Sequence, residues 1–273
     1  MNVKGQWVWI TGASSGLGHE LARQLAKKGA NLVVTARRLE RLEALKKELE
    51  ALGVQVKPLA ADLSRAEDVE RAVAEVKKTP VSMAVLNAAV THFGHHHELE
   101  WKAFEAMIHT NVVATSRLTH ELVRHFRAGT GGRVMLVTSM TGLIPVPFQS
   151  AYSGTKAYLT AFGTALAHEL QGTNTSVTVF APGGIVTEMT QGENFGPLRG
   201  WLAPVDAVAR EAVEALEERP VLRVAGFTNR FGLFLYRLVP RNLFIGQTAR
   251  VYRKALAEVA SRNEGDKKAP QGG

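Results

Sequence analysis

The feature that most constrains the fold is an alternation of short apolar runs with longer amphipathic stretches. The apolar runs are typical of strands and lie at 7–10, 31–36, 54–60, 83–88, 132–139, 176–182 and 219–227. Helical patterns separate them, at 16–28, 38–52, 66–78, 101–128, 151–170 and 204–218. This alternation predicts a parallel sheet with both faces covered by helices. Because crossovers between parallel strands are right-handed, we expect a Rossmann-type, doubly wound α/β fold with seven strands, as one domain over residues 1–273.

The composition excludes several classes of protein. Apolar residues make up 45% of the 273, which is enough for a large core and too many for a disordered chain. The chain has no cysteine, so it has no disulfide, no cysteine-ligated zinc and no thiol nucleophile. No stretch reaches the roughly 18 apolar residues that a membrane span needs. We therefore expect a cytoplasmic protein, in which any membrane association would be peripheral.

A glycine-rich turn, "TGASSGLG" (11–18), follows the first expected strand. Glycine lets the backbone approach a ligand closely, and the helix that starts here directs unpaired N–H groups and its positive end toward an anion such as a pyrophosphate. The turn predicts a dinucleotide site with contacts from Gly12, Ser14, Ser15, Gly16, Leu17 and Gly18. Its G-x3-G-x-G spacing differs from the common G-x-G-x-x-G, and a glycine turn without a ligand is the alternative.

The end of the second expected strand bears on which dinucleotide binds. NAD sites place Asp or Glu about 20 residues beyond the glycines, where it holds the ribose 2′-hydroxyl. This chain has Ala36 there, followed by Arg37 and Arg38. An arginine can hold a 2′-phosphate through charge-assisted hydrogen bonds, so the sequence favours NADP(H) over NAD(H). The alternative is that both arginines are solvated at the start of a helix.

At this point the sequence resembles the short-chain dehydrogenase/reductase family over residues 5–190. The similar segments are "TGASSGLG" (11–18), "ADL" (61–63), "NAAV" (87–90) and "PGGIVTEM" (182–189). The resemblance implies cofactor contacts from Asp62, which would meet the adenine ring, and from Leu63, Asn87, Ala88, Pro182, Gly183, Ile185 and Thr187. Ala88 and Val90 depart from the family's usual N-N-A-G, and we expect slightly altered packing there.

Four further residues fall where that family has its catalytic tetrad: Asn111, Ser139, Tyr152 and Lys156. Tyr152 and Lys156 are four residues apart, so they share one face of a helix. A nearby ammonium and the positive ring of an oxidised nicotinamide favour the phenolate, which would lower the tyrosine pKa and suit it to general acid–base catalysis. We expect Ser139 to bond the substrate oxygen. The resemblance implies that Lys156 also binds the nicotinamide ribose and that Asn111 holds a water of a proton relay.

The chain beyond Thr187 is expected to select the substrate. Residues 188–203 are rich in glycine and mixed in polarity, which predicts a mobile lid. Residues 226–256 combine aromatic with basic side chains, and Pro240 would interrupt any helix there. From Arg219 to Ala257 there are eight basic residues and no acidic one, which accounts for the net charge of +8. Two interpretations stay open for 226–256, an apolar pocket or subunit interface and a surface for an anionic membrane, with a plainly packed terminus as a third. Residues 262–273 predict a flexible tail.

The predicted function is an NADP(H)-dependent interconversion of a ketone or aldehyde with an alcohol, on an apolar or lipid-like substrate. A regulator that binds NADP(H) without turnover is the alternative, although it would have no need of Tyr152. Nucleic-acid binding is disfavoured, because the basic segment is equally rich in aliphatic residues and contains no reading motif.

Two further expectations concern assembly and metals. Long apolar helices at 101–128 and 151–170 correspond to interface helices of the family, which implies a homodimer or homotetramer. We expect no metal site, and we interpret His95–His97 as part of a polar loop, because consecutive side chains rarely converge on one ion.

Overall fold

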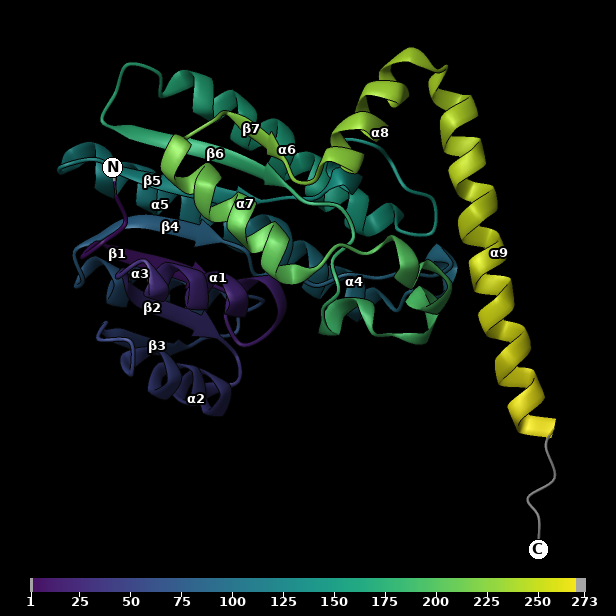
Figure 1. The fold of residues 1–273 in the computed structure, drawn as a ribbon, viewed down its shortest axis with the longest axis horizontal. Helices are drawn as coiled ribbons and strands as arrows, with labels where there is room; N and C mark the ends of the chain where they lie inside the picture. Colours follow the sequence, from purple (N-terminus) through teal and green to yellow (C-terminus); the bar gives the residue numbers. More distant parts are fainter. Residues whose placement is uncertain (1, 269–273) are drawn as a thin grey trace, which may run out of the picture.

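A seven-stranded, all-parallel sheet forms the centre of the molecule (Figure 1). The computed structural model describes residues 2–268, although not the side chains at positions 193, 198 and 262–268. The strands are β1 (Trp7–Thr11), β2 (Asn31–Ala36), β3 (Val56–Ala60), β4 (Val81–Leu86), β5 (Gly132–Val137), β6 (Thr175–Ala181) and β7 (Leu222–Val224). They lie in the order β3-β2-β1-β4-β5-β6-β7, which confirms the predicted doubly wound fold. The order reverses between β1 and β4, where such sheets open a crevice at their carboxyl ends.

Helices cover both faces of the sheet. The α-helices are α1 (Gly16–Lys27), α2 (Leu39–Glu50), α3 (Ala66–Lys77), α4 (Trp101–Ile108), α5 (Thr115–Ala128), α6 (Ser150–Glu169), α7 (Val205–Glu218), α8 (Phe227–Leu238) and α9 (Arg241–Lys268). Helices α1, α2 and α7 bury their apolar residues on one face, and α3, α5 and α6 bury theirs on the other. Helices α4, α8 and α9 lie beyond the carboxyl ends of the strands, at the right of Figure 1.

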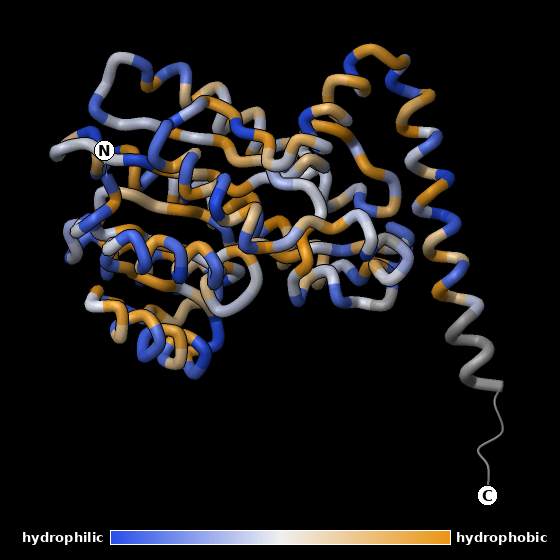
Figure 2. Tube along the Cα trace, viewed as in Figure 1, coloured by the Kyte–Doolittle hydropathy of each residue, from blue (hydrophilic) through white to orange (hydrophobic). Residues whose placement is uncertain are grey.

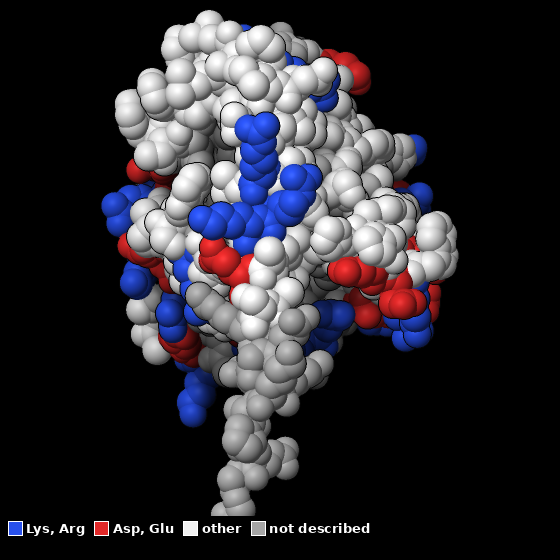
Figure 3. All heavy atoms as spheres, turned by 90° about the vertical axis from the view of Figure 1, so that its right-hand side faces the viewer, with Lys and Arg blue, Asp and Glu red and all other residues white. Residues whose placement is uncertain are grey.

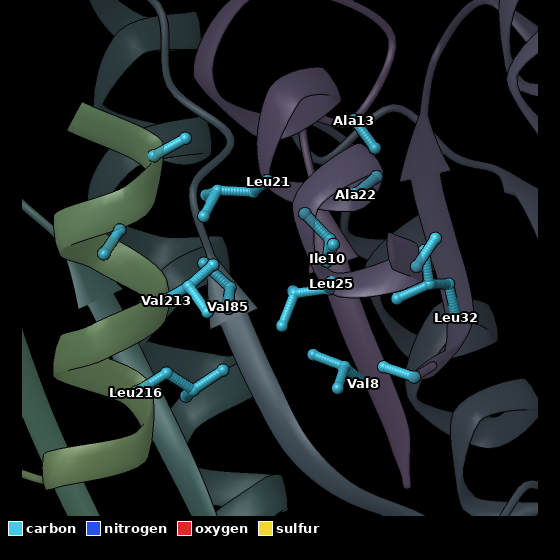
Figure 4. Packing of buried hydrophobic residues seen from close by; sticks show 14 of the residues in the cluster. Val8, Ile10, Ala13, Leu21, Ala22, Leu25, Leu32, Val85, Val213 and Leu216 are labelled. Carbon is cyan, nitrogen blue, oxygen red and sulfur yellow. The ribbon is translucent and has the colours of Figure 1, made fainter. Parts of the chain in front are cut away.

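The alternation of side chains along β1 shows how the sheet joins two cores. Val8 and Ile10 point to the core under α1 and α7, where Figure 4 shows them beside Leu21, Leu25 and Val213. Trp9 points to the opposite core, and its indole N–H donates to the Thr35 hydroxyl at 2.8 Å. Successive residues of a strand point to opposite faces of the sheet. A run of three apolar residues in β1 therefore contributes to the cores on both faces.

Shorter helical turns complete the connections. They are η1 (His96–Glu98), η2 (His109–Ala114), η3 (Met140–Gly142), η4 (Glu188–Thr190) and η5 (Glu193–Trp201). The expected single helix over 101–128 is therefore divided, because η2 is a π-helical turn between α4 and α5. The wider turn places Asn111, which is fully buried, against Val90 in the loop after β4. The seventh strand is also shorter than the expected 219–227.

The C-terminal segment forms two helices that meet at Pro240, as the sequence predicted. Hydrophobic residues recur along both of them (Figure 2). Helix α9 packs against η5 and the loop after β4 through an aromatic cluster, in which the ring of Phe93 lies 5.0 Å from that of Phe195 and 5.2 Å from that of Tyr252. The backbone of α9 continues to Lys268, so the expected tail at 262–273 is helical up to that residue, and 269–273 lie outside the described residues. None of the helices described is long and apolar enough to cross a bilayer.

Candidate active site

A cleft of about 580 Å³ opens at the carboxyl ends of the strands, between the sheet and the segment that follows β6. Its volume is in the range of sites for small molecules and cofactors. It is lined by most of the residues that the sequence predicted: Gly12, Ser14, Ser15, Gly16, Leu17, Arg37, Arg38, Asp62, Leu63, Asn87, Ala88, Ser139, Tyr152, Lys156, Pro182, Gly183, Ile185 and Thr187. Gly18 and Asn111 do not line it, and each supports the cleft from behind.

The glycine turn is the most tightly packed part of the cleft. Gly12 has a φ of +71°, and a Cβ there would lie 2.8 Å from the Cα of Ala88. A Cβ on Gly18 would lie 2.3 Å from the carbonyl oxygen of Gly12. Asn87 fixes this arrangement by donating its side-chain N–H groups to the carbonyls of Thr11 and Gly12, at 3.1 and 3.3 Å. The turn thus brings bare backbone and the first residues of α1 to the cleft, which fits a pyrophosphate.

Arginines and serines lie together at the β2 side of the cleft. Arg38 donates to the hydroxyls of Ser14 and Ser15 at 3.2 and 3.4 Å, whereas Arg37 is exposed at the cleft's edge. Arg38 also reaches a carboxylate of Glu188, a residue that the sequence did not single out, at 3.4 Å. This corner therefore combines positive charge with hydroxyl groups, and one carboxylate from the opposite side of the cleft is paired with it.

Asp62 lines the cleft but has partners of its own. Its carboxylate accepts from the backbone N–H and the hydroxyl of Ser64, at 3.0 and 2.8 Å, and so holds the turn after β3. Its backbone N–H donates to Asp68 at 2.7 Å, and this bond lowers the pKa of Asp68. The side chain of Asp62 thus shapes the loop that would face an adenine ring.

Tyr152 and Lys156 face the cleft from one side of α6, with Ser139 opposite at the end of β5. The Lys156 ammonium lies 5.7 Å from the centre of the Tyr152 ring and donates to the carbonyl of Val137 at 2.8 Å. Burial raises the pKa of Tyr152 to about 12, against a smaller opposing effect of the Ser139 hydroxyl. Burial likewise lowers the pKa of Lys156 to about 8.

The sequence analysis predicted a lowered pKa for Tyr152. This prediction is wrong for the effects of the protein itself, which raise that pKa. Removing a phenolate from water costs more than the hydrogen bond of the Ser139 hydroxyl returns. Tyr152 consequently keeps its proton at neutral pH.

Asn111 has a supporting place. Its side-chain oxygen accepts from the backbone N–H of Val90 at 2.9 Å, and its amide N–H groups donate to the Val90 carbonyl at 2.9 Å and to the Thr155 hydroxyl at 3.1 Å. Both amide hydrogens are thus used to join the loop after β4 to α6. The side chain thus fixes the helix that carries Tyr152 and Lys156.

The outer wall of the cleft comes from the two segments that the sequence predicted to select the substrate, 188–203 and 226–256. Apolar side chains from the segment after β6 and from α9 line it, namely Met189, Phe195, Trp201, Leu202, Phe244, Val251 and Tyr252. Asn229 of α8 packs against Gly183, where a Cβ would lie 2.5 Å from its amide. The sequence indicated these two segments but not which of their side chains face the cleft, because that depends on packing between segments distant in the chain.

The three consecutive histidines lie outside the cleft. His95, His96 and His97 are exposed around the short turn η1, and the rings of His95 and Phe148 meet edge to face at 5.1 Å. In the described part of the chain, no group of three His, Cys, Asp or Glu side chains could hold a metal ion.

The family model for short chain dehydrogenases matches residues 6–196. The chain belongs to this family. An uncharacterized oxidoreductase of Myxococcus xanthus is 33% identical to this short-chain dehydrogenase over 201 residues, which are 73% of the chain and 79% of the relative. A 7β-hydroxysteroid dehydrogenase of Collinsella aerofaciens is 33% identical over 184 residues, 67% of the chain and 70% of the relative.

Solved structures agree with this assignment. One from a study of 7β-hydroxysteroid dehydrogenase stereoselectivity superposes with a TM-score of 0.82 at 29% identity, covering 91% of the chain and 99% of that protein. A short-chain dehydrogenase from Sphingobium yanoikuyae in complex with NADPH has a TM-score of 0.73 at 27% identity, covering 80% and 87%. A 3-ketoacyl-(acyl-carrier-protein) reductase from Brucella melitensis complexed with NADH has a TM-score of 0.70 at 27% identity, covering 78% and 91%. The chain is thus an oxidoreductase that acts on CH–OH groups with a nicotinamide cofactor.

The close packing of the glycine turn makes a prediction about Gly18. We expect Gly18→Ala to lower the free energy of unfolding by about 3 kcal/mol, because the new methyl group overlaps the Gly12 carbonyl. Gly154→Ala is the matched control, since a Cβ at this helical glycine of α6 meets nothing within 4 Å, and we expect it to raise the unfolding free energy by about 0.5–1 kcal/mol. Denaturant titration followed by circular dichroism measures both, and a Gly18→Ala protein as stable as the wild type would contradict the packing argument.

Proposed function

We propose that this short-chain dehydrogenase is an NADP(H)-dependent reductase of ketones or aldehydes carried on large apolar or lipid-like molecules. The observation that carries the proposal is the position of Tyr152, which lies beside Ser139 and Lys156 in a cleft with an apolar outer wall. The family relationship restricts the chemistry to alcohol and carbonyl groups. The charges at one side of the cleft then favour one nicotinamide cofactor over the other, and the apolar residues at the opposite side favour an apolar class of substrate.

The proposed chemistry follows from what each side chain can donate. When bound, the nicotinamide supplies a hydride to the carbonyl carbon, or accepts one in the reverse direction. Tyr152 donates its phenolic proton to the carbonyl oxygen, so that carbon and oxygen together gain the two hydrogens of an alcohol. The Ser139 hydroxyl donates a hydrogen bond to the same oxygen and stabilises the negative charge that develops there. The Lys156 ammonium stabilises the phenolate that remains until solvent returns a proton.

The protonation states favour reduction at neutral pH. With a pKa of about 12, Tyr152 is almost entirely in the phenol form, which is the form that reduction requires. With a pKa of about 8, Lys156 is mainly charged at pH 7 and loses its proton above that value. Oxidation needs the phenolate, so its rate should increase as the pH rises.

The preference for NADP(H) rests on the corner formed by Arg37, Arg38 and Ser14. No acidic residue stands at the end of β2, where Ala36 precedes the arginines. Arg38 and the Ser14 hydroxyl are already within hydrogen-bonding distance of each other and could both donate to a 2′-phosphate. The solved relatives include complexes with NADPH and with NADH, so they do not favour either cofactor. The proposed preference therefore depends on Arg37, Arg38 and Ser14.

An apolar substrate is supported by the outer wall. Phe195, Phe244 and Tyr252 present aromatic surface to the cleft, and no acidic or basic side chain of η5 or α9 lines it among the described residues. The relatives named for 7β-hydroxysteroids agree with a substrate of this kind. We propose that residues 188–203 act as the lid over it.

The outward face of α8 supports a peripheral membrane contact. Phe227, Phe231, Phe234 and Leu238 follow a helical stripe, and each is between 52% and 74% exposed. Five cations of α8 and α9 form no ion pair with any described residue: Arg237, Arg241, Arg250, Arg253 and Lys254. Figure 3 shows Lys and Arg side chains gathered on the face formed by α9. An exposed apolar stripe on α8, together with cations that have no ion-pair partner among the described residues, is complementary to an anionic lipid surface, so we propose a cytoplasmic protein that docks on such membranes.

The same proposal leaves other surfaces for assembly. The helices expected at a subunit interface expose Val113 in the π-helical turn and Tyr158 on α6. A homodimer or homotetramer through these helices would keep the α8 face accessible.

Tyr152→Phe tests the mechanism. We expect the variant to keep its affinity for NADPH and to lose reduction of a ketone panel by about 10²–10⁴-fold, because the proton donor is gone. Tyr158→Phe is the matched control on the same helix, where the hydroxyl contacts only Ser116 at 3.3 Å among the described residues, and it should stay active. Absorbance of NADPH measures turnover, and oxidation by the wild type should accelerate with pH. An active Tyr152→Phe protein would end this mechanism, and an inactive wild type on every carbonyl would favour a regulator.

Arg38→Ala tests the cofactor assignment. Nicotinamide fluorescence should show that the wild type binds NADPH more tightly than NADH. We expect Arg38→Ala to reduce this preference by about tenfold or more, because a charge-assisted hydrogen bond to the phosphate is lost. Arg124→Ala, at an exposed position of α5, is the control that should change nothing. Equal affinities of the wild type for the two cofactors would refute the assignment.

Exchanging Phe231 and Phe234 for Gln tests the membrane surface. The wild type should co-sediment with vesicles of anionic phospholipid in a salt-sensitive way, and the double variant should bind severalfold more weakly. Leu52→Gln removes an exposed apolar side chain from the other end of the molecule and should have no effect. A wild type that stays in the supernatant at low salt would refute the membrane contact.

A further inference from the structure

One carboxylate crosses the cleft and ties its two sides together. Glu188 follows Thr187 at the start of the segment 188–203, on the β6 side. Its carboxylate lies 2.6 Å from the guanidinium of Arg41 and 3.4 Å from that of Arg38, both at the start of α2 on the β2 side. The hydrogen bond from Arg41, the larger effect, and the bond from Arg38 lower the pKa of Glu188, so the side chain is charged at neutral pH.

The carboxylate shares its place with the anion proposed for this corner. The nitrogen of Arg38 that meets Glu188 is the same one that donates to the hydroxyls of Ser14 and Ser15. A 2′-phosphate held by Arg38 and Ser14 would therefore lie close to the carboxylate of Glu188. The phosphate and the Glu188 carboxylate would repel each other because both are negative. The phosphate carries the greater charge and is therefore the stronger partner for the Arg38 guanidinium.

Glu188 is also fixed to the segment that follows it. Thr187 and Thr190 form a reciprocal pair of backbone and side-chain hydrogen bonds around it, including Thr187 N–H to Thr190 at 3.1 Å. The methyl group of Thr187 lies 3.1 Å from where a Cβ of Gly16 would be, so this turn rests directly on the glycine turn. A movement of Glu188 away from Arg38 would thus move the start of the segment 188–203.

We propose that Glu188 is a selectivity and lid-positioning residue that competes with the cofactor's 2′-phosphate for Arg38. Without the phosphate, Glu188 pairs with Arg38 and Arg41 and holds the start of the lid over the cleft. When a 2′-phosphate takes Arg38, this anchor weakens and the lid loosens. Glu188 therefore reduces the affinity for phosphorylated cofactors and links their binding to the position of the lid. The inference rests on the proposed NADP(H) preference.

Calorimetric titration tests the competition with two nucleotides that differ only in the phosphate, adenosine 2′,5′-bisphosphate and adenosine 5′-monophosphate. Both ion pairs are partly exposed, so we expect Glu188→Gln to tighten binding of the bisphosphate by about two- to fivefold and to leave the monophosphate unchanged. Glu188→Asp retains the charge and should stay nearer to the wild type. Glu40→Gln, which removes the same charge from an exposed site in the first turn of α2, is the matched control and should not change the ratio.

Limited trypsin digestion tests the lid separately. Arg199 lies exposed in η5, and cleavage after it reports how firmly the segment is held. We expect the bisphosphate, and not the monophosphate, to speed this cleavage in the wild type, and we expect Glu188→Gln to be cleaved quickly with either nucleotide or none.

Two outcomes would overturn different parts of this scheme. A wild type that binds both nucleotides equally would refute the NADP(H) assignment and the competition with it. A wild type that prefers the bisphosphate, with the same preference in Glu188→Gln, would refute the role of Glu188 alone.

Discussion

Hydrogen bonds between the carboxyl ends of β1 and β4 hold the floor of the cleft, and the other parts of the site are placed by them. The Thr11 hydroxyl accepts from the backbone N–H groups of Asn87 and Ala88 at 3.0 and 3.1 Å, and the Asn87 side chain returns to the carbonyls of the glycine turn. This pairing leaves no room for a side chain at Gly12 or Gly18. The start of α1 therefore sits directly above the crevice that the reversed strand order creates.

The two titratable groups proposed for catalysis, Tyr152 and Lys156, lose hydration because they are buried, and this loss disfavours their charged forms. Lys156 is 2% exposed and has one backbone acceptor, so its charge is poorly stabilised, and its pKa falls to about 8. Tyr152 meets the same environment and becomes a weaker acid. Asn111 stabilises this arrangement by joining α6 to the loop after β4 through hydrogen bonds to Val90 and Thr155. These bonds fix the helix that carries Tyr152 and Lys156 next to the end of β5. Sites that need a titratable group in a poorly solvated place commonly accept lower stability there.

The segment beyond the family's shared region serves two surfaces at once. Phe244 and Tyr252 turn toward the cleft, whereas Phe231 and Phe234 turn outward from α8. An apolar wall of the cleft and an exposed aromatic stripe thus lie on different faces of the same pair of helices. Glu188 joins the start of the segment 188–203 to Arg38 and Arg41 at the start of α2.

The sequence by itself determined the order of strands and helices, the doubly wound fold and most of the cleft's inner lining, because periodicity and short motifs act between neighbouring residues. It also placed the break at Pro240, since proline has no N–H to donate. Only the tertiary structure decided the direction of the pKa shift at Tyr152, the supporting place of Asn111, the ion pairs of Glu188 and the outer wall of Phe195, Phe244 and Tyr252. Each of these depends on how closely segments far apart in the chain approach one another, and burial and distance, which set their energies, are not written in any local pattern.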